Sequence, residues 1–364
     1  MPEDIQSYSA VDPEGISQAM ADLDSALASP DEEQFDVPVF SELLGIGEEV
    51  YRQIRGALRS GKKHLMFYGP PGTGKTSIAE LLAGFLHDEY KLITGSSDWS
   101  SQDIIGGYQP VGGGLRFRPG ILLENFDKPL IIDELNRCDI DKVIGPLFTV
   151  LSGQATTLAY QINPDQENSP RCVILPEPKA ETVVDATHAD TGQYEFAPTR
   201  KWRILATINS IDKASLYQMS YALSRRFGWI LVDVPKDKAQ FVIDYVAKEW
   251  KITGSLEQAA TSPVVGIWSA VNSVRKMGPA PFIDLLKMCR TAGIAFNPFD
   301  APNDQTRPAY LDAFYCFLLP MLDGIQFNEA EQVSKGVGQA LALAQDDEQY
   351  KALLDRLTDV SIKI

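Results

Sequence analysis

One run of eight residues restricts what this chain can fold into more than any other part of it. The run fits the phosphate-binding loop pattern G-x-x-x-x-G-K-[ST] at every fixed position, with the sequence Gly69-Pro70-Pro71-Gly72-Thr73-Gly74-Lys75-Thr76. Residues 64–68 before it are apolar and predict a buried strand, and residues 77–86 after it have helical periodicity. We therefore expect a strand, a glycine-rich loop and a helix in succession, the context in which this pattern binds phosphate.

The residue types in the loop explain its chemistry. Glycines let backbone N–H groups turn inward around phosphate oxygens, and the N-terminus of the following helix adds partial positive charge. We expect Lys75 to contact the β- and γ-phosphates of a nucleoside triphosphate and Thr76 to offer its hydroxyl to Mg²⁺. The predicted cofactor-binding set runs from Gly69 to Ser77. The alternative is a turn that only connects the strand to the helix. The segments 64–68 and 77–86 on either side of the loop, and the motifs further along the chain, disfavour it.

Two later apolar strands also end in polar residues. Residues 128–134 end in Asp133 and Glu134, and residues 202–209 end in Asn209. An apolar strand has no packing reason to end in two carboxylates, but it has a chemical one. We expect Asp133 to join the Mg²⁺ shell and Glu134 to orient and polarise an attacking water. If the two strands are neighbours, Asn209 lies beside Glu134 and helps to position that water.

Negative charge is concentrated at the start of the chain. Residues 1–51 hold 13 of the 49 acidic residues and no Lys or Arg, so the rest carries 36 acidic against 33 basic residues. This balance argues against strong autonomous binding of the chain as a whole to nucleic acid, but it leaves room for a local basic surface in the nearly neutral remainder. We expect residues 1–38 to form an acidic leader with one candidate helix at 16–27. The leader is either a solvated arm or a docking segment for a partner subunit.

The remaining pattern predicts two folded parts. Residues 39–235 alternate strands and helices and form an α/β core, in which a hairpin is expected at 106–120. A second insertion, 155–200, begins with paired strands and is expected to be irregular and exposed from residue 176 onward. Residues 236–364 have helical periodicity throughout and predict an all-α second domain.

Other classes of protein are disfavoured. No run of 18 apolar residues is present, and the N-terminus lacks the features of a secretory signal, so we expect no membrane contact. The four cysteines and three histidines are scattered without the spacing of a zinc site. Reduced thiols in a cytoplasmic protein are the simplest interpretation.

Together these motifs resemble those of the AAA+ ATPases, in the branch of McrB-like and MoxR-like proteins. The resemblance covers roughly residues 43–325, with Gly69–Thr76 as Walker A, Ile131–Glu134 as Walker B and Asn209 as sensor 1. It implies an AAA+ core, a parallel sheet between helices, followed by an all-α lid. The continuation from Asp133 to Phe148 looks closer to McrB-like than to MoxR-like proteins.

The resemblance also implies how such a chain acts. The segment Leu223–Phe227 matches an Arg-Arg-Phe element, so Arg225 and Arg226 are expected to reach the nucleotide of a neighbouring subunit in a homo-oligomeric ring, typically a hexamer. The hairpin at 106–120 matches an insertion near the central pore. ATP is the expected nucleotide because most of the branch uses it, with GTP left open.

Two departures shape the functional hypothesis. Phe282 occupies the position of the sensor-2 arginine of MoxR-like proteins, and Lys213 stands where McrB-like motors usually have Arg. Residues 1–38 are too short for the DNA-recognition domain of McrB, so DNA would be reached only indirectly or through a partner.

We therefore expect the motor subunit of a McrBC-like restriction or phage-defence complex that drives a nuclease partner. The alternative is a MoxR-like chaperone ATPase that remodels a client protein or metalloenzyme. A nucleotide-gated scaffold without hydrolysis is disfavoured by Glu134, Asn209 and the arginine pair.

Overall fold

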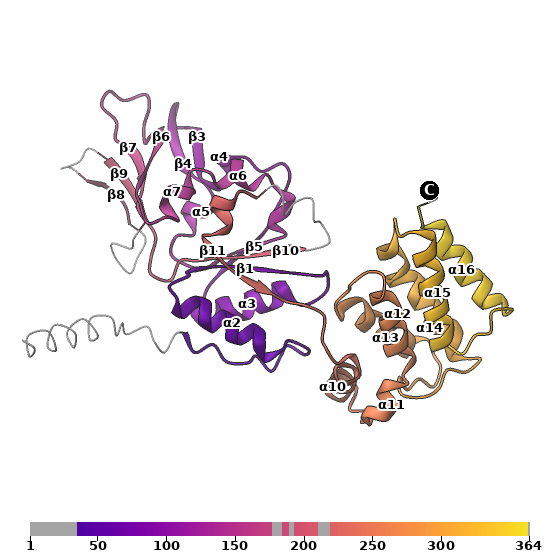
Figure 1. Ribbon diagram of the computed structural model, residues 1–364. Helices are drawn as coiled ribbons and strands as arrows, with labels where there is room; N and C mark the ends of the chain where they lie inside the picture. The colour runs from indigo at the N-terminus through magenta and orange to yellow at the C-terminus, as the bar shows by residue number, and fades with distance from the viewer. Residues whose placement is uncertain (1–34, 177–183, 189–192, 210–218, 363–364) are drawn as a thin grey trace, which may run out of the picture.

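The protein consists of an α/β core and a separate group of helices, seen side by side in Figure 1. The computed structural model describes residues 35–176, 184–188, 193–209 and 219–362. All but the last four residues of the predicted acidic leader, including the candidate helix at 16–27, lie outside the described residues, as does Lys213.

The core is built on a five-stranded sheet whose paired strands all run parallel. Its strand order is β11-β1-β10-β5-β2, with bounds Phe227–Leu231, His64–Gly69, Ile204–Asn209, Leu130–Asp133 and Lys91–Thr94. The central strands are buried on both faces, as expected for apolar runs in a parallel sheet.

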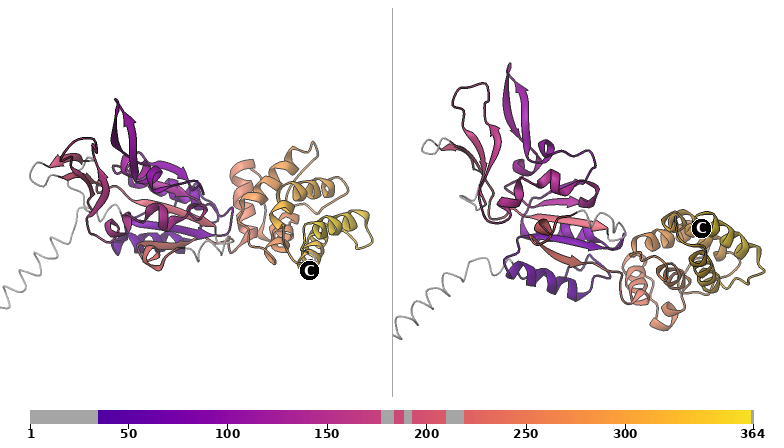
Figure 2. Two further views of the ribbon diagram at one scale, coloured as in Figure 1. Left: turned by 90° about the horizontal axis from the view of Figure 1, so that it is seen from above. Right: turned by 45° about the horizontal axis from the view of Figure 1, so that its top comes forward.

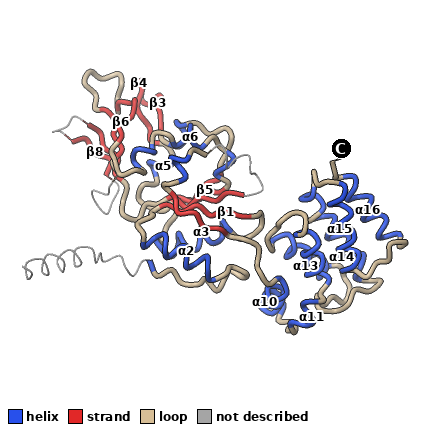
Figure 3. Tube along the Cα trace, viewed as in Figure 1, coloured by secondary structure: helices blue, strands red, loops and turns tan. Residues whose placement is uncertain are grey.

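Side chains alternate between the two faces of this sheet. Leu65 and Phe67 of β1 pack toward α2 (Glu48–Arg59) and α3 (Lys75–Leu86). Met66 packs into the cluster on the other face, beneath a group of short helices (Figure 3). Those helices are α4, α5, η2, α6, α7 and α9, with bounds Ser101–Ile104, Ile121–Glu124, Leu135–Arg137, Ile140–Ile144, Leu147–Val150 and Tyr221–Ser224.

Residues 140–150 form two short helices, α6 and α7, with a break between them. Gly145 and Pro146 separate the two, and a proline lacks the N–H group that a continuous helix needs. Asp139 caps α6 by accepting a hydrogen bond from the backbone N–H of Lys142 at 3.3 Å.

A β-rich arm projects from the core (Figure 2). It contains the predicted hairpin, β3 (Gly106–Val111) and β4 (Gly114–Pro119), and a four-stranded sheet in the order β6-β7-β9-β8. The strands of that sheet are Thr156–Gln161, Arg171–Ile174, Gln193–Ala197 and Val184–His188. A backbone hydrogen bond links the hairpin to the segment after β6, because the N–H of Phe117 donates to the carbonyl of Ile162 at 2.9 Å.

The expectation of irregular structure from residue 176 onward is therefore wrong for β8 and β9. Strand β9 pairs in parallel with β7 and antiparallel with β8, and Phe196 buries its ring against the core. The pairing of β9 with β7 joins two segments that are separated in sequence. The composition of the residues after 176, rich in Pro, Thr and Asp, does not reveal this pairing.

The helical part, which we call the lid, has its own apolar core. Trp268 and Phe282 stack with ring centroids 4.8 Å apart, and Tyr310 and Phe314 are buried around them. Among the described residues, no helix is both long enough and apolar enough to cross a membrane. The lid elements are α10 to α14, η3, α15 and α16, with bounds Lys238–Trp250, Leu256–Ala260, Pro263–Asn272, Ala280–Thr291, Thr306–Phe317, Leu319–Leu322, Phe327–Ala340 and Glu348–Asp359.

Candidate functional site

The sheet brings most of the predicted site residues to one edge. Strands β1, β10 and β5 are neighbours and parallel, so their carboxyl ends meet. Gly69 at the end of β1 lies opposite Asn209 at the end of β10, and β5 ends at Asp133. Topology thus assembles three segments that are far apart in sequence, as expected for ligand sites in open parallel sheets.

The glycine-rich loop has the backbone conformation that only glycine adopts freely. Gly72 and Gly74 have φ angles of 72° and 87°, and helix α3 begins directly after them at Lys75. A Cβ on Gly69 would collide with the carbonyl oxygen of Val232. The loop therefore wraps closely before a helix N-terminus, an arrangement that suits a phosphate group. Ser77, further along α3, is exposed.

Lys75 is buried at the base of this loop. Its ammonium group donates hydrogen bonds to the carbonyls of Pro70 at 2.7 Å and Gly69 at 3.2 Å. Burial lowers the pKa of Lys75 to about 8, while the carboxylates of Glu134 and Asp133 act in the opposite direction. A buried ammonium with only neutral carbonyl acceptors fits an anionic ligand, because phosphate oxygens would favour its charged form.

Oxygen ligands for Mg²⁺ gather around Asp133. Its Oδ1 accepts hydrogen bonds from the hydroxyls of Thr76 and Thr207, both at 2.6 Å. A carboxylate and a hydroxyl next to a phosphate-binding loop are the hard donors that Mg²⁺ prefers. Asp133 and Thr76 would hold the ion, and Thr207 would orient the carboxylate.

Glu134 is held in an unusual backbone conformation beside Asn209. Its φ is 53°, in the left-handed region that residues with a Cβ rarely occupy. The side-chain amide of Asn209 donates to Glu134 Oε1, and Arg137 Nε lies 3.7 Å from Oε2. Thr207 Oγ1 also accepts the backbone N–H of Glu134 at 3.0 Å.

Sequence reasoning missed Thr207 and gave Arg137 no role. Thr207 and Asn209 are two residues apart on β10, so both face the same side of the sheet. A polar residue at this spacing inside an apolar strand was the available signal. For Arg137, proximity to Glu134 in the turn after β5 becomes visible only in three dimensions.

The lid contacts the loop through its backbone. The N–H groups of Gly278 and Ala280 donate to the carbonyls of Pro71 and Gly72 at 2.8 and 3.2 Å. The Phe282 side chain is buried in the lid core instead, so no side chain from that position reaches the loop. The start of α13 therefore contacts the loop through its backbone, at the position where MoxR-like proteins carry the sensor-2 arginine.

An apolar pocket of about 280 Å³ adjoins the loop between core and lid. Leu43, Leu44 and Ile46 line it from the core, and Phe241 and Ile283 line it from the lid. Its lining is mainly apolar, although Glu42, Lys248 and Glu249 also contribute, and its position beside Gly72–Gly74 suits a purine ring. The sequence analysis did not assign residues to base binding.

The two predicted arginines lie elsewhere. Arg225 and Arg226 precede β11, so they stand at the amino-terminal edge of the sheet, opposite the edge with the glycine-rich loop. The Lys62 ammonium group, just before β1, donates to the carbonyl of Arg225 at 2.7 Å. Within one chain the structure therefore does not bring Arg225 and Arg226 to the predicted phosphate site.

Comparison with known proteins shows what the core is similar to. A family model described as an AAA domain of the dynein-related subfamily matches residues 64–227. The type IV methyl-directed restriction enzyme EcoKMcrB subunit of Escherichia coli K12 is 29% identical over 195 residues, which are 50% of this chain and 37% of that protein. A replication factor C small subunit of Pyrobaculum islandicum is 50% identical over 52 residues, which are 14% of this chain and 16% of the relative. The aligned part thus spans little more than a third of the McrB subunit.

Solved structures give a weaker likeness. A mutant of Thermotoga maritima RuvB aligns with 84% of this chain and 87% of its own, at 14% identity and a TM-score of 0.41. The Saccharomyces cerevisiae Hsp104–ADP complex aligns with 66% of this chain and 44% of its own, at 14% identity and a TM-score of 0.36. Values of this size support no inference about function.

Proposed function

We propose that this chain is a Mg²⁺-dependent nucleoside triphosphatase that acts in a ring, and the match of residues 64–227 to the model of a dynein-related AAA domain supports this. The observation that carries the proposal is the meeting of three strand ends. The loop from Gly69 to Thr76 faces Asp133 and Glu134, and Asn209 contacts Glu134. These residues cover phosphate binding, Mg²⁺ binding and activation of the attacking water.

The proposed mechanism relies on positioning and charge. Loop N–H groups and Lys75 hold the phosphates. Thr76 and Asp133 would hold Mg²⁺, which would neutralise the charge that develops on the phosphate oxygens. Glu134 orients a water molecule for attack on the terminal phosphate and accepts its proton. Asn209 fixes the Glu134 carboxylate, and its amide donor keeps that carboxylate turned toward the site.

A second cation for the terminal phosphate, in addition to Lys75, would come from another copy of the chain. Arg225 and Arg226 are the candidates, and they lie at the opposite edge of the same sheet from Lys75. In a ring, the arginine edge of one subunit would face the nucleotide edge of the next. We propose a homo-oligomer, of hexameric type, on this basis.

For the biological role we propose a motor subunit related to McrB, driving a nuclease-type partner. The similarity of half of this chain to a McrB subunit supports the proposal. Rates of ATP and GTP hydrolysis should be measured with and without double-stranded DNA and a candidate nuclease. Stimulation by a nuclease supports the motor; stimulation only by a client protein or metalloenzyme supports a MoxR-like chaperone instead.

The central test is Glu134→Gln. This variant keeps the size of the side chain and one oxygen that can accept from Asn209, but it loses the carboxylate that accepts a proton. We expect nucleotide affinity within about threefold of wild type and kcat lower by at least about 100-fold. Equilibrium binding of a fluorescent ATP analogue and steady-state phosphate release measure the two.

Lys91→Ala is the matched control, because Lys91 is exposed on β2 and contacts no predicted ligand group. It should retain both affinity and turnover. Near-normal turnover in Glu134→Gln would refute the assignment of the general base. An inactive wild type with tight nucleotide binding would instead favour a nucleotide-gated scaffold.

A further inference from the structure

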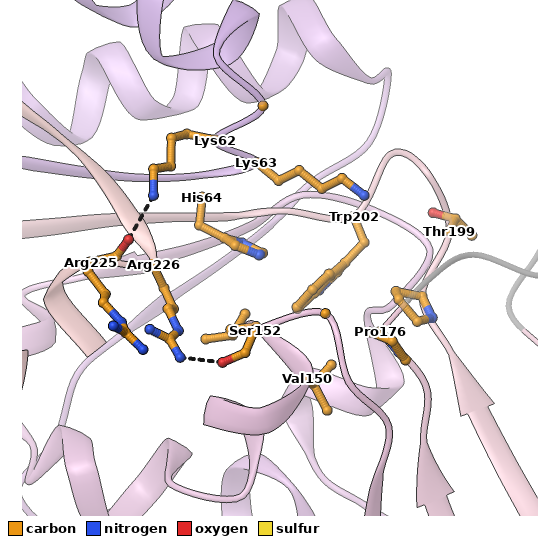
Figure 4. Close-up of a pocket in the computed structure, with 14 residues that line it drawn as sticks. Lys62, Lys63, His64, Val150, Ser152, Pro176, Thr199, Trp202, Arg225 and Arg226 are labelled. Atoms are coloured by element: carbon orange, nitrogen blue, oxygen red, sulfur yellow. Dashed lines mark hydrogen bonds between the residues drawn. The ribbon is translucent and has the colours of Figure 1, made fainter. Parts of the chain in front are cut away.

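A basic pocket of about 520 Å³ lies at the amino-terminal edge of the central sheet. Cationic side chains line it, and none of the described residues that line it is acidic. The cations are Lys62 and Lys63, just before β1, and Arg225 and Arg226, just before β11. Figure 4 shows the two arginine side chains running side by side, with Lys62 bonded to the carbonyl of Arg225. Two neighbouring strands thus bring four positive charges to one pocket.

The charge of this pocket is not compensated. None of its four cations forms an ion pair with a carboxylate in the part of the chain that the structure describes. Arg226 donates to the hydroxyl of Ser152, and Lys62 donates to a backbone carbonyl, so both acceptors are neutral. Lys236, by contrast, pairs with Glu49 at 2.8 Å although it is exposed. A pocket that holds unpaired like charges attracts an acidic group.

The acidic leader joins the described structure beside this pocket. Asp36 Oδ1 lies 3.6 Å from Nη2 of Arg59, and Nη1 of Arg55 donates to the carbonyl of Val37 at 2.8 Å. Val37 is fully buried, which anchors this segment to the core. Arg59 is the last residue of α2 and stands three residues before Lys62, so their Cα atoms are at most about 11 Å apart.

The leader carries the charge that the pocket lacks. Residues 1–34 contain nine acidic residues and no Lys or Arg. Three of the acids are consecutive, Asp31-Glu32-Glu33, and end three residues before the anchored Asp36. Asp31 stands five residues before Asp36, and five extended residues span roughly 17 Å, which brings the run within reach of the pocket. A tether this short holds the run at an effective concentration on the order of millimolar.

We propose that the run Asp31-Glu32-Glu33 docks in the basic pocket of its own chain. Docking covers the edge of the sheet that the next subunit of the proposed ring would use, so the leader and a neighbouring subunit compete for it. The leader is therefore a brake on assembly. This consequence rests on the proposed ring, whereas docking itself does not.

Cross-linking of the full chain tests docking directly. A carbodiimide joins a carboxylate to a lysine amine that it contacts, and an equal mixture of unlabelled and isotope-labelled chains shows whether both partners come from one molecule. At low salt we expect links from residues 31–33 to Lys62 or Lys63 within one chain. About 0.5 M NaCl should remove most of them, because it shortens the Debye length to about 4 Å.

Neutralisation of the run tests the brake. The full-length variant Asp31→Asn/Glu32→Gln/Glu33→Gln should assemble at a protein concentration at least about tenfold below that of wild type, because the tethered competitor is lost. Sedimentation analysis measures this midpoint.

The matched control is Asp12→Asn/Asp22→Asn/Asp24→Asn, which removes the same charge farther from the anchor. Its midpoint should move by less than about threefold, because these acids lie outside the docked run.

A charge swap tests the pairing of run and pocket. Lys63→Glu should reduce the links from residues 31–33 to Lys62 by about fivefold or more, because it places a like charge beside the run. Addition of Glu33→Lys to this variant should restore cross-linking in the opposite sense, from the new amine to the new carboxylate. Lys63 is exposed, so thermal unfolding of both variants should match wild type.

Three outcomes would overturn the inference. Absence of links to Lys62 and Lys63 at low salt would exclude docking, and links only between chains of different isotope would assign the pocket to the leader of a second copy. Equal shifts of the assembly midpoint in the two neutralised variants would show a general effect of charge. Failure of the proposed ring would look different, because wild type would then form the links without assembling.

Discussion

At the scale of single residues, Asp133 and Glu134 illustrate how adjacent carboxylates acquire separate roles. Asp133 accepts two hydroxyl hydrogen bonds and turns toward the loop. Glu134 has a backbone in the left-handed region, and its carboxylate accepts a hydrogen bond from the side-chain amide of Asn209. Such conformations cost about 1–3 kcal/mol and persist where the surroundings hold them, here through the Thr207 hydroxyl.

Lys75 provides a pH prediction at this scale. Its pKa of about 8 lies below the usual value of 10.5, so the free protein loses the ammonium charge as pH rises through 8. Bound phosphates favour the charged form, and above pH 8 binding must therefore take up a proton. The nucleotide dissociation constant should be flat below pH 8 and rise by as much as about tenfold per pH unit above it.

Titration of a fluorescent ATP analogue between pH 7 and 9.5 measures this slope. Lys75→Met, which lacks the titrating amine, should bind weakly and show no comparable slope. A flat profile for the wild type would show that the Lys75 pKa is not lowered in the free protein.

At the scale of elements, the beginning of α13 is joined to the phosphate-binding loop. The contacts run between backbone groups, so they need close approach rather than a particular side chain. Gly278 makes the approach feasible, because a Cβ there would collide with the carbonyl oxygen of Gly72. We therefore expect a shift of the loop on nucleotide binding or release to move the lid through these backbone contacts.

Gly278→Ala should disrupt this contact. We expect a nucleotide dissociation constant raised about tenfold and a folded state destabilised by about 1–3 kcal/mol, the usual cost of overpacking. Binding titration and thermal unfolding measure the two effects. Gly56→Ala is the matched control, since open space surrounds Gly56 in α2 and alanine favours a helix there. Equal behaviour of the two variants would contradict a role for the contact.

At the scale of the whole molecule, the nucleotide edge and the arginine edge lie at opposite ends of the same parallel strands. A head-to-tail ring uses both edges of every subunit, whereas a two-fold dimer would pair like edges. The β-rich arm joins the core beside the arginine edge, because Pro176 and Pro198, which follow β7 and β9, line the same pocket as Arg225 and Arg226. Its hairpin is braced where the Tyr108 hydroxyl accepts the Gln161 N–H at 2.9 Å.

This arrangement predicts that hydrolysis depends on protein concentration. Turnover per subunit should rise and reach a plateau as assembly proceeds, because each site needs an arginine, Arg225 or Arg226, from another copy. Sedimentation analysis in parallel should place the rise at the concentration where oligomers form. The double variant Arg225→Ala/Arg226→Ala should assemble yet stay slow at every concentration. Constant turnover per subunit across the dissociation range would indicate a site that is complete within one chain.

The sequence by itself determined the local parts of this protein. Adjacent residues encode the loop at 69–76, the carboxylates Asp133 and Glu134, and the hairpin around Gly112 and Gly113. These features depend on the backbone conformations that glycine can adopt and on short runs of apolar residues, both of which are properties of neighbouring residues. Strand, loop and helix at the start of the core were accordingly predicted as the structure has them.

Only the tertiary structure decided what depends on distant residues. It placed Thr207 between Asp133 and Glu134, set Gly278 against the phosphate-binding loop, and paired β9 with β7. It also separated the exposed Arg225 from the bonded Arg226, which look equivalent in sequence. These contacts arise when neighbouring strands are brought together and buried polar groups find partners, and the partner of each group is set by residues distant in the chain.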